Sequence, residues 1–347
     1  MEKKFYSFIR IISTFYNNFF FKKLTIIGKE KIPNDGAIIF SPNHQSALLD
    51  PLLIGSTCGK RLYSLTRSDV FRKPFLWVLN AMQTIPVYRM RDGFEKLHQN
   101  KKVFEKCYEL LKVKNNLLIF SEGKHHDEYY LMPISKGSSR IGLEGLKKFP
   151  NTIIYLQAVG INYGSHKHPY HNCTIVYGDP IKLNEFINLY EKKPIKTLNR
   201  VRLKLEREMK KCLWLPNYSK EYFIKKNLIN FKNTKHEFNL LKKKISLEGN
   251  KLKNNNSKTI IDEIAIAFFS IFNLIPLMLI HSALKKINDR VFHLSAKYLI
   301  GFFIFPLWWT IVFIVSVNFF NITLSIAIIL FLVLFLFFRQ FLIIKNK

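Results

Sequence analysis

Residues 37–51 of the chain read AIIFSPNHQSALLDP, and this stretch decides the fold. Its apolar beginning, Ala37 to Phe40, is typical of a short buried strand, and the polar turn that follows contains His44. From Leu48 onward the residues begin a helical pattern. A strand, a polar turn and a helix in this order form the repeating unit of an α/β fold, in which ligands bind where strands end and helices begin.

The same rhythm returns twice along the chain. NNLLIFSEG at 115–123 and NTIIYLQAVGI at 151–161 are further short buried-strand candidates, each followed by Gly and polar residues. Helical patterns lie between them at Lys96–Lys112 and Arg140–Lys148. We therefore predict an α/β domain with a mixed, mostly parallel sheet flanked by helices.

The N-terminal segment has apolar residues at helical spacing, among them Phe5, Phe8, Ile12, Phe15 and Phe19. Polar residues interrupt the segment, so it does not form a continuous span. It predicts an amphipathic helix that lies in the membrane interface. The alternative is a helix whose apolar face packs on the core of the soluble domain.

The C-terminal segment predicts a membrane hairpin. Tyr298–Val317 and Ile322–Phe338 are each long and apolar enough to span a bilayer, and the link between them is uncharged. The flanks of this hairpin carry Lys297 and Arg339, so the positive-inside rule predicts that both flanks are cytoplasmic.

The apolar segment Ile264–Ile280 precedes the hairpin and is harder to assign. It is short, it contains Pro276, and basic residues lie on both sides of it. We expect it to re-enter the membrane or to lie in the interface rather than to cross.

The net charge of +30 at pH 7 is spread through the soluble part and is densest just before the apolar tail. This distribution suits an anionic membrane surface, although a lysine-rich composition can also come from an AT-rich genome. A nucleic-acid binder is disfavoured because no recognised module is present. The four cysteines form no CxxC pair, which indicates neither a zinc cluster nor a disulfide framework, and no cleavable signal peptide is evident. We expect a reducing, cytoplasmic soluble part.

The turn after the first strand contains a His and an Asp six positions apart, His44 and Asp50. A carboxylate that holds a His in one tautomer is the usual way to make a general base at neutral pH. The alternative is a helix N-cap with an exposed His. Two other strand ends support the first interpretation, because IPVYR closes with Arg89, a cation suited to phosphate, and IFSEGK places Glu122 after a strand. Gly123 follows Glu122, and Lys136 comes just before a helix.

At these residues the sequence resembles the glycerophospholipid acyltransferases, the family that includes the glycerol-3-phosphate and lysophosphatidate acyltransferases. Asn43, His44 and Asp50 are similar to its His-Asp motif, and Arg89 falls where the family has an IPxxR-like block. Glu122 and the residue after it are similar to its FPEGT block.

The resemblance covers four blocks in the family's order, from about Gly28 to Ile181. The fourth block is LQAVGINY at Leu156–Tyr163, which stands where the family has a VPV strand but lacks its proline. Four blocks in the correct order make the resemblance specific.

The resemblance implies a role for each matching residue. His44 would be the general base on the acceptor hydroxyl and Asp50 its orienting partner, while Arg89 with Lys136 would hold the acceptor phosphate. The resemblance implies no metal, no cofactor and no covalent acyl-enzyme. The co-substrate would be acyl-CoA or acyl carrier protein. The remaining residues that we assign to substrate binding are Asn43, Glu122, Gly123 and Lys124.

The sequence departs from the family pattern in two places. Five residues separate His44 from Asp50 where the common motif has four, so His44 must lie in the turn before the helix for Asp50 to reach it. This spacing resembles a branch that acts on glycerol-3-phosphate or dihydroxyacetone phosphate. In the third block Ser121, Lys124 and His125 replace Pro, Thr and Arg, and Lys124 can supply the missing cation as a point charge.

The segment SHKHPYH contains His166, His168 and His171 and could suggest a metal site. Because no carboxylate or Cys accompanies these residues and a Pro lies between them, we expect a solvated loop.

We predict four parts along the chain: an amphipathic membrane-associating helix at 1–27, an acyltransferase domain at 28–215, a basic helical linker at 216–258 and a membrane region at 259–347. The predicted function is transfer of an acyl group from a thioester to a hydroxyl of glycerol-3-phosphate in phospholipid synthesis, on the cytoplasmic side of the membrane. The same chemistry on 1-acylglycerol-3-phosphate or another lysolipid stays open. A catalytically inactive, membrane-tethered lipid-binding protein also stays open because of the altered spacing. Expected partners are membrane lipids and the acyl donor, and no nucleic acid.

Overall fold

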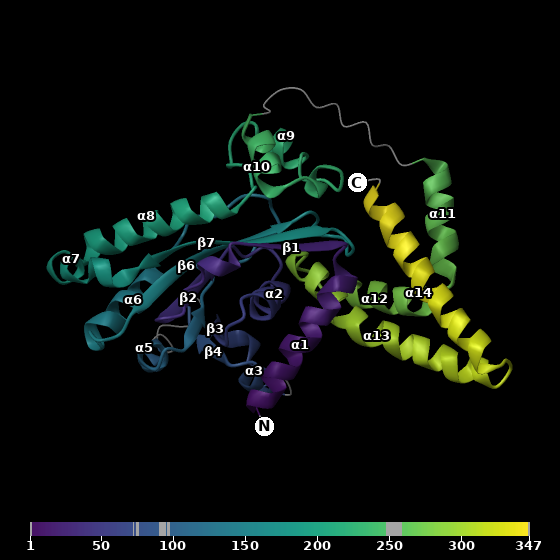
Figure 1. Cartoon of the computed structure of the whole chain (residues 1–347), viewed down its shortest axis with the longest axis horizontal. Coiled ribbons are helices and arrows are strands. Elements are labelled where there is room, and N and C mark those ends of the chain that lie inside the picture. Colours follow the sequence, from purple (N-terminus) through teal and green to yellow (C-terminus); the bar gives the residue numbers. More distant parts are fainter. Residues whose placement is uncertain are drawn as a thin grey trace.

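The computed structural model describes residues 2–71, 73, 76–89, 95, 98–247 and 259–345 (Figure 1). Within these ranges a seven-stranded sheet has the order β1-β7-β6-β2-β5-β3-β4. The strands are β1 Lys23–Ile27, β2 Ala37–Pro42, β3 Leu62–Arg67, β4 Thr84–Val87, β5 Asn116–Leu118, β6 Ile154–Tyr163 and β7 Asn172–Lys182.

The sheet is mixed and mostly parallel, as predicted. Strands β6, β2, β5, β3 and β4 run parallel to their neighbours in that order. β7 is antiparallel to β6, and β1 pairs in parallel with β7, so these two strands run opposite to the rest. β7 contains Gly178 and Pro180, and these residues interrupt the apolar run by which a buried strand is recognised in a sequence.

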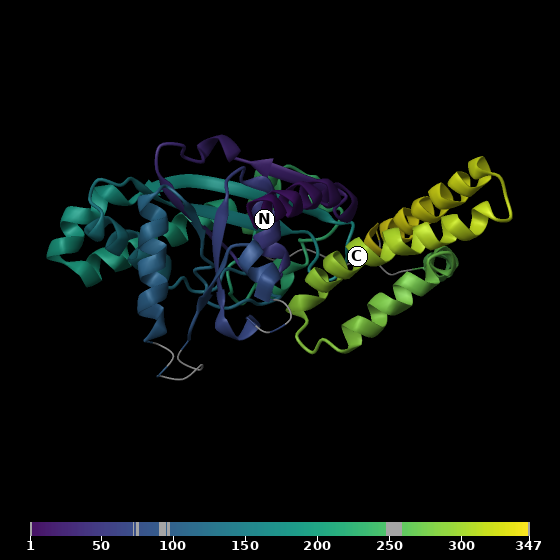
Figure 2. The same cartoon turned by 90° about the horizontal axis from the view of Figure 1, so that it is seen from below.

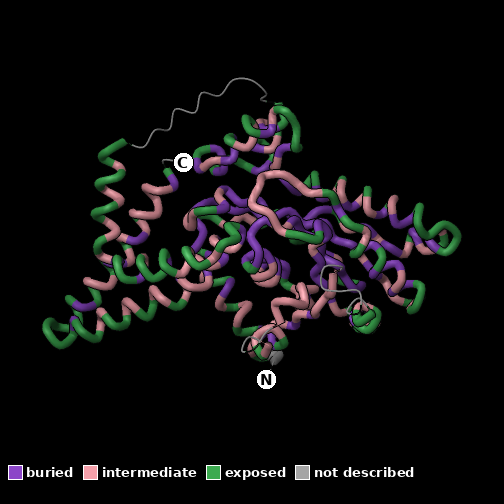
Figure 3. The backbone as a smooth tube through the Cα atoms, turned by 180° about the vertical axis from the view of Figure 1, so that it is seen from behind, coloured by how far each residue is buried: buried purple, intermediate pink, exposed green. Residues whose placement is uncertain are grey.

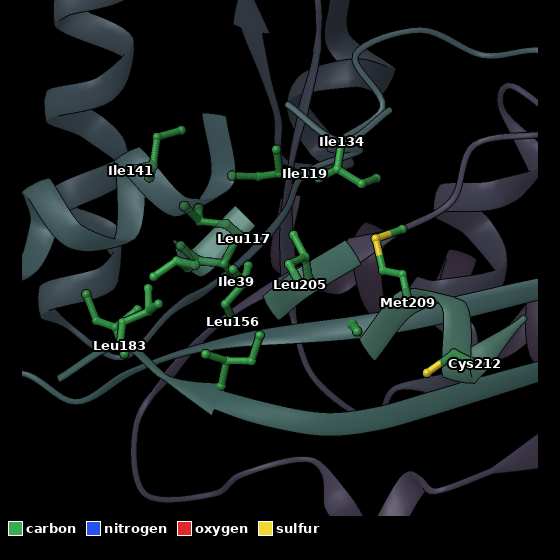
Figure 4. Packing of buried hydrophobic residues seen from close by; sticks show 14 of the residues in the cluster. Ile39, Leu117, Ile119, Ile134, Ile141, Leu156, Leu183, Leu205, Met209 and Cys212 are labelled. Atoms are coloured by element: carbon green, nitrogen blue, oxygen red, sulfur yellow. The ribbon is translucent and has the colours of Figure 1, made fainter. Parts of the chain in front are cut away.

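Helices cover both faces of the sheet. On one face α5, α6 and α8 pack over a core that includes Ile39, Leu117, Leu156 and Leu205 (Figure 4). On the other face a second core contains Phe40 of β2 together with residues of α1 and α2, such as Phe20 and Leu53. The helices of the α/β part are α1 Glu2–Phe20, α2 Leu49–Thr57, α3 Leu76–Ala81, α5 Gln99–Lys112, α6 Gly137–Lys148, α7 Ile187–Lys192, α8 Pro194–Cys212, α9 Tyr222–Lys226 and α10 Phe238–Leu247.

The elements predicted from the sequence form with adjusted limits. The strand at 37–40 is β2 and the helix after it is α2. The strand expected at 115–123 is shorter, since β5 ends at Leu118. The helix expected from Lys96 is described from Gln99, and residues 96 and 97 lie outside the described residues.

Helix α1 is amphipathic, and both interpretations of it find support. Tyr6 and Asn17 are buried on the α/β part. The opposite face carries Ile11 and Phe15, which are 65% and 66% exposed. The helix therefore packs on the domain and also presents an apolar face outward, where contact with a membrane interface stays a prediction.

The division of the chain into four parts stays a prediction, but the segment expected as a linker packs on the domain. Leu228, Leu241 and Ile245 belong to the same hydrophobic core as sheet residues and residues of α8. This burial of apolar residues in a lysine-rich segment cannot be read from its composition. The polar run at 249–258 lies outside the described residues.

The C-terminal helices form an arm at one end of the molecule, projecting from the α/β part (Figure 2). α13 Val291–Val317 and α14 Ile322–Lys345 are both long and apolar enough to cross a membrane, as predicted. α11 Ile260–Ile271 and α12 Leu274–Lys285 bend by 104° at the break between them. Such a pair is either a broken span or a re-entrant loop, so the expectation for 264–280 stays a prediction. Exposed residues are abundant on this arm, whereas the central strands β2, β5 and β6 are mostly buried (Figure 3).

Candidate active site

The carboxyl ends of β2, β3, β4 and β5 lie along one edge of the sheet because these strands are parallel. The turns at this edge carry His44, Arg67, Arg89 and Glu122. In open parallel sheets this edge is where ligands bind. The structure therefore brings together residues that are far apart in the sequence.

His44 lies in the turn before α2 and is held by Asp50. Its Nδ1 lies 2.8 Å from Asp50 Oδ2. Since a carboxylate only accepts, Nδ1 carries the proton and donates it, which leaves Nε2 as the basic nitrogen. The imidazole is also stacked on Phe120, with ring centroids 3.9 Å apart. The carboxylate and the aromatic ring together fix its tautomer and its orientation.

Asp50 also organises the turn around His44. Its Oδ2 accepts the backbone N–H groups of Gln45 and Ser46, both at 2.9 Å, and its Oδ1 accepts the Tyr163 hydroxyl at 2.6 Å. The carboxylate is fully buried, so these bonds replace the water that it would otherwise bind. Burial, with the Asp50 charge as the next cause, raises the pKa of Tyr163 well above its usual value.

The five-residue spacing is accommodated as predicted. His44 precedes the helix, which begins at Leu49, and Asp50 lies in its first turn. Ala47 completes the loop between them with a φ of +37°, in the left-handed region that L-residues rarely adopt. The extra residue is therefore absorbed in the turn, and the His-Asp contact is kept.

Asn43 does not face the site. Its amide oxygen accepts Ile161 N–H at 2.7 Å, and its Nδ2 donates to Ile161 O at 3.0 Å and to Gln45 Oε1 at 3.2 Å. The side chain is buried. It therefore pins the turn of His44 to β6, which differs from the substrate contact that we expected.

Glu122 also differs from its expected role as a phosphate contact. Its Oε1 accepts the His44 N–H at 2.7 Å, and its Oε2 accepts Met132 N–H at 3.0 Å and lies 3.1 Å from His126 Nε2. A buried carboxylate repels a phosphate, and here both of its oxygens are engaged. Glu122 therefore positions the backbone of the catalytic turn.

The loop after Glu122 closes over His44. Gly123 has a φ of +72° that favours glycine, and its N–H donates to Phe120 O at 3.0 Å. His126 N–H donates to His44 O at 3.2 Å, which brings the loop with the exposed Lys124 beside the imidazole. Ser135 N–H donates to Ser121 O, and this bond places Lys136, the residue just before α6, near the same turn.

His125 was not assigned a role from the sequence, yet its ring lies edge-on to His44 with centroids 5.5 Å apart. Its Nε2 is 3.1 Å from Asp289 Oδ2, in the segment before α13. Burial lowers the pKa of His125, although the Asp289 contact opposes this effect.

The cationic part of the site centres on Asp69. Arg67 pairs with Asp69, and the guanidinium of Arg89 lies 3.5 Å from the same carboxylate. The hydrogen bond from Arg67 is the main cause that lowers the pKa of Asp69 to about 2. Arg67 and Arg89 therefore lie together at the ends of β3 and β4, on one carboxylate. Arg67 ends β3, which has no long apolar run, so the sequence did not indicate that this arginine lies at the site.

The C-terminal arm contacts the turn that contains His44 directly. Ser295 in the second turn of α13 is buried, accepts Leu49 N–H at 3.0 Å and donates to Ser46 O at 2.6 Å. Leu294 and Tyr298 of the same helix belong to the core that contains Leu49 and Leu53. The start of α13 is therefore part of the wall around the His44 turn, and no motif in the sequence indicated this.

The expectation of a solvated loop at SHKHPYH is wrong for two of its histidines. His166 and His171 are buried, because His166 stacks on Tyr129 with centroids 4.0 Å apart and His171 packs on Phe21. Burial lowers the pKa of His166 to about 4 and that of His171 to about 3. Among the residues that the structure describes, no group of three or more His, Cys, Asp or Glu side chains is placed to hold a metal ion.

Part of the chain is similar to known acyltransferases. Residues 23–157 match the family model described as Acyltransferase. The chain is 26% identical over 156 residues to the 1-acyl-sn-glycerol-3-phosphate acyltransferase BAT2, chloroplastic, of Brassica napus, covering 44% of this chain and 43% of that protein. It is 32% identical over 82 residues to the glycerol-3-phosphate O-acyltransferase 1 of Saccharomyces cerevisiae, covering 23% of this chain and 11% of that one.

Among solved structures, the 1-acyl-sn-glycerophosphate (LPA) acyltransferase PlsC from Thermotoga maritima aligns at 18% identity with a TM-score of 0.43. The alignment covers 59% of this chain and 80% of that one. The matched segments span less than half of the length of both curated relatives.

Proposed function

From the match of residues 23–157 to the acyltransferase family model, we propose that the protein is a membrane-bound O-acyltransferase of glycerolipid synthesis. It transfers an acyl group from a thioester donor, acyl-CoA or acyl carrier protein, to a hydroxyl of glycerol-3-phosphate. The observation that carries this proposal is the 2.8 Å contact between His44 and Asp50, which leaves Nε2 of His44 as a base at the edge of the sheet.

In the proposed step His44 Nε2 takes the proton of the acceptor hydroxyl as its oxygen attacks the thioester carbonyl carbon. The C–S bond then breaks, and the leaving thiolate receives the proton from the imidazolium. The charge of Asp50 stabilises that imidazolium. The guanidinium groups of Arg67 and Arg89 would bind the phosphate of the acceptor, with Lys124 and Lys136 as further cations.

Glycerol-3-phosphate is our first choice of acceptor because the five-residue spacing resembles the branch that acts on it. The second candidate is 1-acylglycerol-3-phosphate, the acceptor in the printed name of the Brassica napus relative. Either acceptor presents a phosphate to the arginines. We further propose that the site faces the cytoplasm, since basic residues flank both ends of the hairpin.

The test is acyl transfer by the full-length protein in nanodiscs, with labelled acyl-CoA or acyl-loaded carrier protein offered to each acceptor separately. We expect product from one acceptor, and we expect His44→Ala to lower turnover about 10²–10⁴-fold, the usual contribution of a positioned base. The matched control is His236→Ala, an exposed histidine outside the site, which should retain turnover.

Two outcomes would contradict the proposal. Full activity in His44→Ala would remove the base assignment. A folded, membrane-bound protein that gives no product from any pairing would support the inactive lipid-binding alternative.

A further inference from the structure

A cavity lies where the C-terminal arm meets α1. It has a volume of about 820 Å³, within the range of roughly 300–1,000 Å³ that is typical of small-molecule sites. Its walls come from α1, the segment 168–170, α12, α13 and α14. None of the residues that we place in the active site lines it.

Most of the lining is aromatic or aliphatic, contributed by every wall. Representative lining residues are Phe19, Tyr170, Leu277, Phe302, Trp309 and Phe337. Asn273, fully buried at the bend between α11 and α12, accepts from Trp309 Nε1 at 3.1 Å and donates to Leu332 O at 2.9 Å. These bonds tie α12, α13 and α14 together, so the cavity has a defined shape.

The charged groups in this lining are all basic. Lys297 and Arg339 lie in the wall, and no Asp or Glu lines the cavity among the described residues. Arg339 Nε donates to Ser270 Oγ at 2.7 Å, and within the described ranges no carboxylate lies within 4.0 Å of its guanidinium. An arginine near the end of an apolar helix can extend its charged group to the depth of the lipid headgroups.

Both cations lie at the same end of the helix hairpin. Lys297 is near the beginning of α13, and Arg339 is near the end of α14. Since the two helices are antiparallel, Lys297 and Arg339 form the basic flanks of the hairpin, and such flanks lie at the depth of lipid headgroups. The rest of both helices extends away through apolar residues. A cavity with an apolar body and cations at the headgroup level is complementary to a phospholipid.

We infer that this cavity binds one acyl chain of an anionic phospholipid from the surrounding bilayer, with its phosphate against Arg339 and Lys297. A guanidinium offers a planar pair of donors that matches phosphate oxygens. Lys297 Nζ donates to Lys167 O at 2.6 Å and so adds a fixed positive charge beside the entrance. The site does not depend on acyl transfer at His44.

The experiment uses the full-length protein in nanodiscs that contain phosphatidylglycerol with a diazirine in its acyl chain. After irradiation, mass spectrometry locates the labelled peptides. We expect labelling of α12, α13 and α14 at cavity residues, and about tenfold less labelling in Arg339→Gln, because a charge-assisted hydrogen bond is lost. Arg339→Lys should restore part of it. The matched control is Lys345→Gln, which removes one charge from the same helix outside the cavity lining.

A second variant tests the apolar body. A Cβ at Gly301 would lie 3.2 Å from the Tyr16 hydroxyl, so Gly301→Leu should fill part of the cavity and lower the labelling. Thr310→Leu, on the exposed side of α13, is its control. Thermal unfolding of each variant checks that it is folded.

Three outcomes would overturn the inference. Equal labelling of wild type and Arg339→Gln would remove the phosphate contact. Equal labelling by diazirine diacylglycerol, which has no phosphate, would show an unselective lipid surface. Labelling confined to exposed residues of α13 and α14 would show that the cavity stays empty of lipid.

Discussion

At the scale of single residues, the candidate site depends on one carboxylate. Asp50 holds the imidazole of His44, two backbone N–H groups and the hydroxyl of Tyr163. Its removal therefore disturbs both the base and the turn that carries it.

Asp50→Asn should lower turnover about 10²–10⁴-fold, because an amide no longer stabilises the imidazolium or enforces one tautomer of His44. Tyr163→Phe removes only one hydrogen bond to the same carboxylate and should cost far less activity. Steady-state kinetics in nanodiscs measure both. Equal losses of turnover in the two variants would show that Asp50 acts by holding the turn in shape and not by its charge on His44.

The buried histidines predict a pH dependence of stability. The pKa of His166 is lowered to about 4 by burial, below its usual value of about 6.5. Between these values the unfolded chain binds a proton that the folded chain does not. Stability should thus be full above about pH 6.5 and fall as the pH drops toward about 4, by roughly 3 kcal/mol for this residue.

Thermal unfolding between pH 7.5 and 4.5 measures this effect. His166→Gln keeps a donor toward Asp127 O but cannot titrate, so its unfolding midpoint should change less with pH than that of the wild type. The exposed His236→Gln variant should keep the wild-type slope. If His166→Gln also kept the wild-type slope, His166 would not be the residue that binds the extra proton in the unfolded chain.

At the scale of elements, the second turn of α13 completes the catalytic turn. Ser295 bonds to Leu49 N–H and Ser46 O, on either side of the loop that absorbs the extra residue at Ala47. The membrane helix and the His44 turn therefore share hydrogen bonds.

Ser295→Ala should lower kcat about tenfold with little change in the acceptor KM, since the loss of its two bonds loosens the turn without touching the phosphate site. Ser295→Thr should restore part of kcat. The control is Ser325→Ala, a serine fully buried in α14 whose hydroxyl donates to Asn321 O in the preceding turn. A rise in KM with unchanged kcat would show that Ser295 acts on binding instead.

At the scale of the whole molecule, the α/β part and the membrane arm share one core. Leu294 and Tyr298 of α13 pack with Phe20, Leu49 and Leu53. The arm, whose two long helices are apolar enough to cross a membrane, is therefore also a structural element of the site.

A chain ending at Leu247 should consequently be less stable and at least tenfold less active than the full chain, because burial of the apolar α13 residues is lost. Thermal unfolding and turnover in the same detergent measure the two effects. Retention of full activity by the truncated chain would show that the arm serves only for attachment.

The sequence by itself determined the α/β class, the His44–Asp50 pair and the two helices that are long and apolar enough to cross a membrane. Apolar runs followed by polar turns reveal buried parallel strands, and uninterrupted apolar stretches reveal spans, because both patterns are local. The sequence also required His44 to precede its helix, since the geometry of six residues on a helix would separate it from Asp50.

Only the tertiary structure decided what the neighbours of these residues do. Glu122 and Asn43 were expected at the substrate, but their partners are backbone groups of His44 and Ile161. Ser295 reaches the same turn from 246 residues away along the chain. Hydrogen bonds and burial between distant segments depend on how the chain packs, and a local pattern carries no information about that packing.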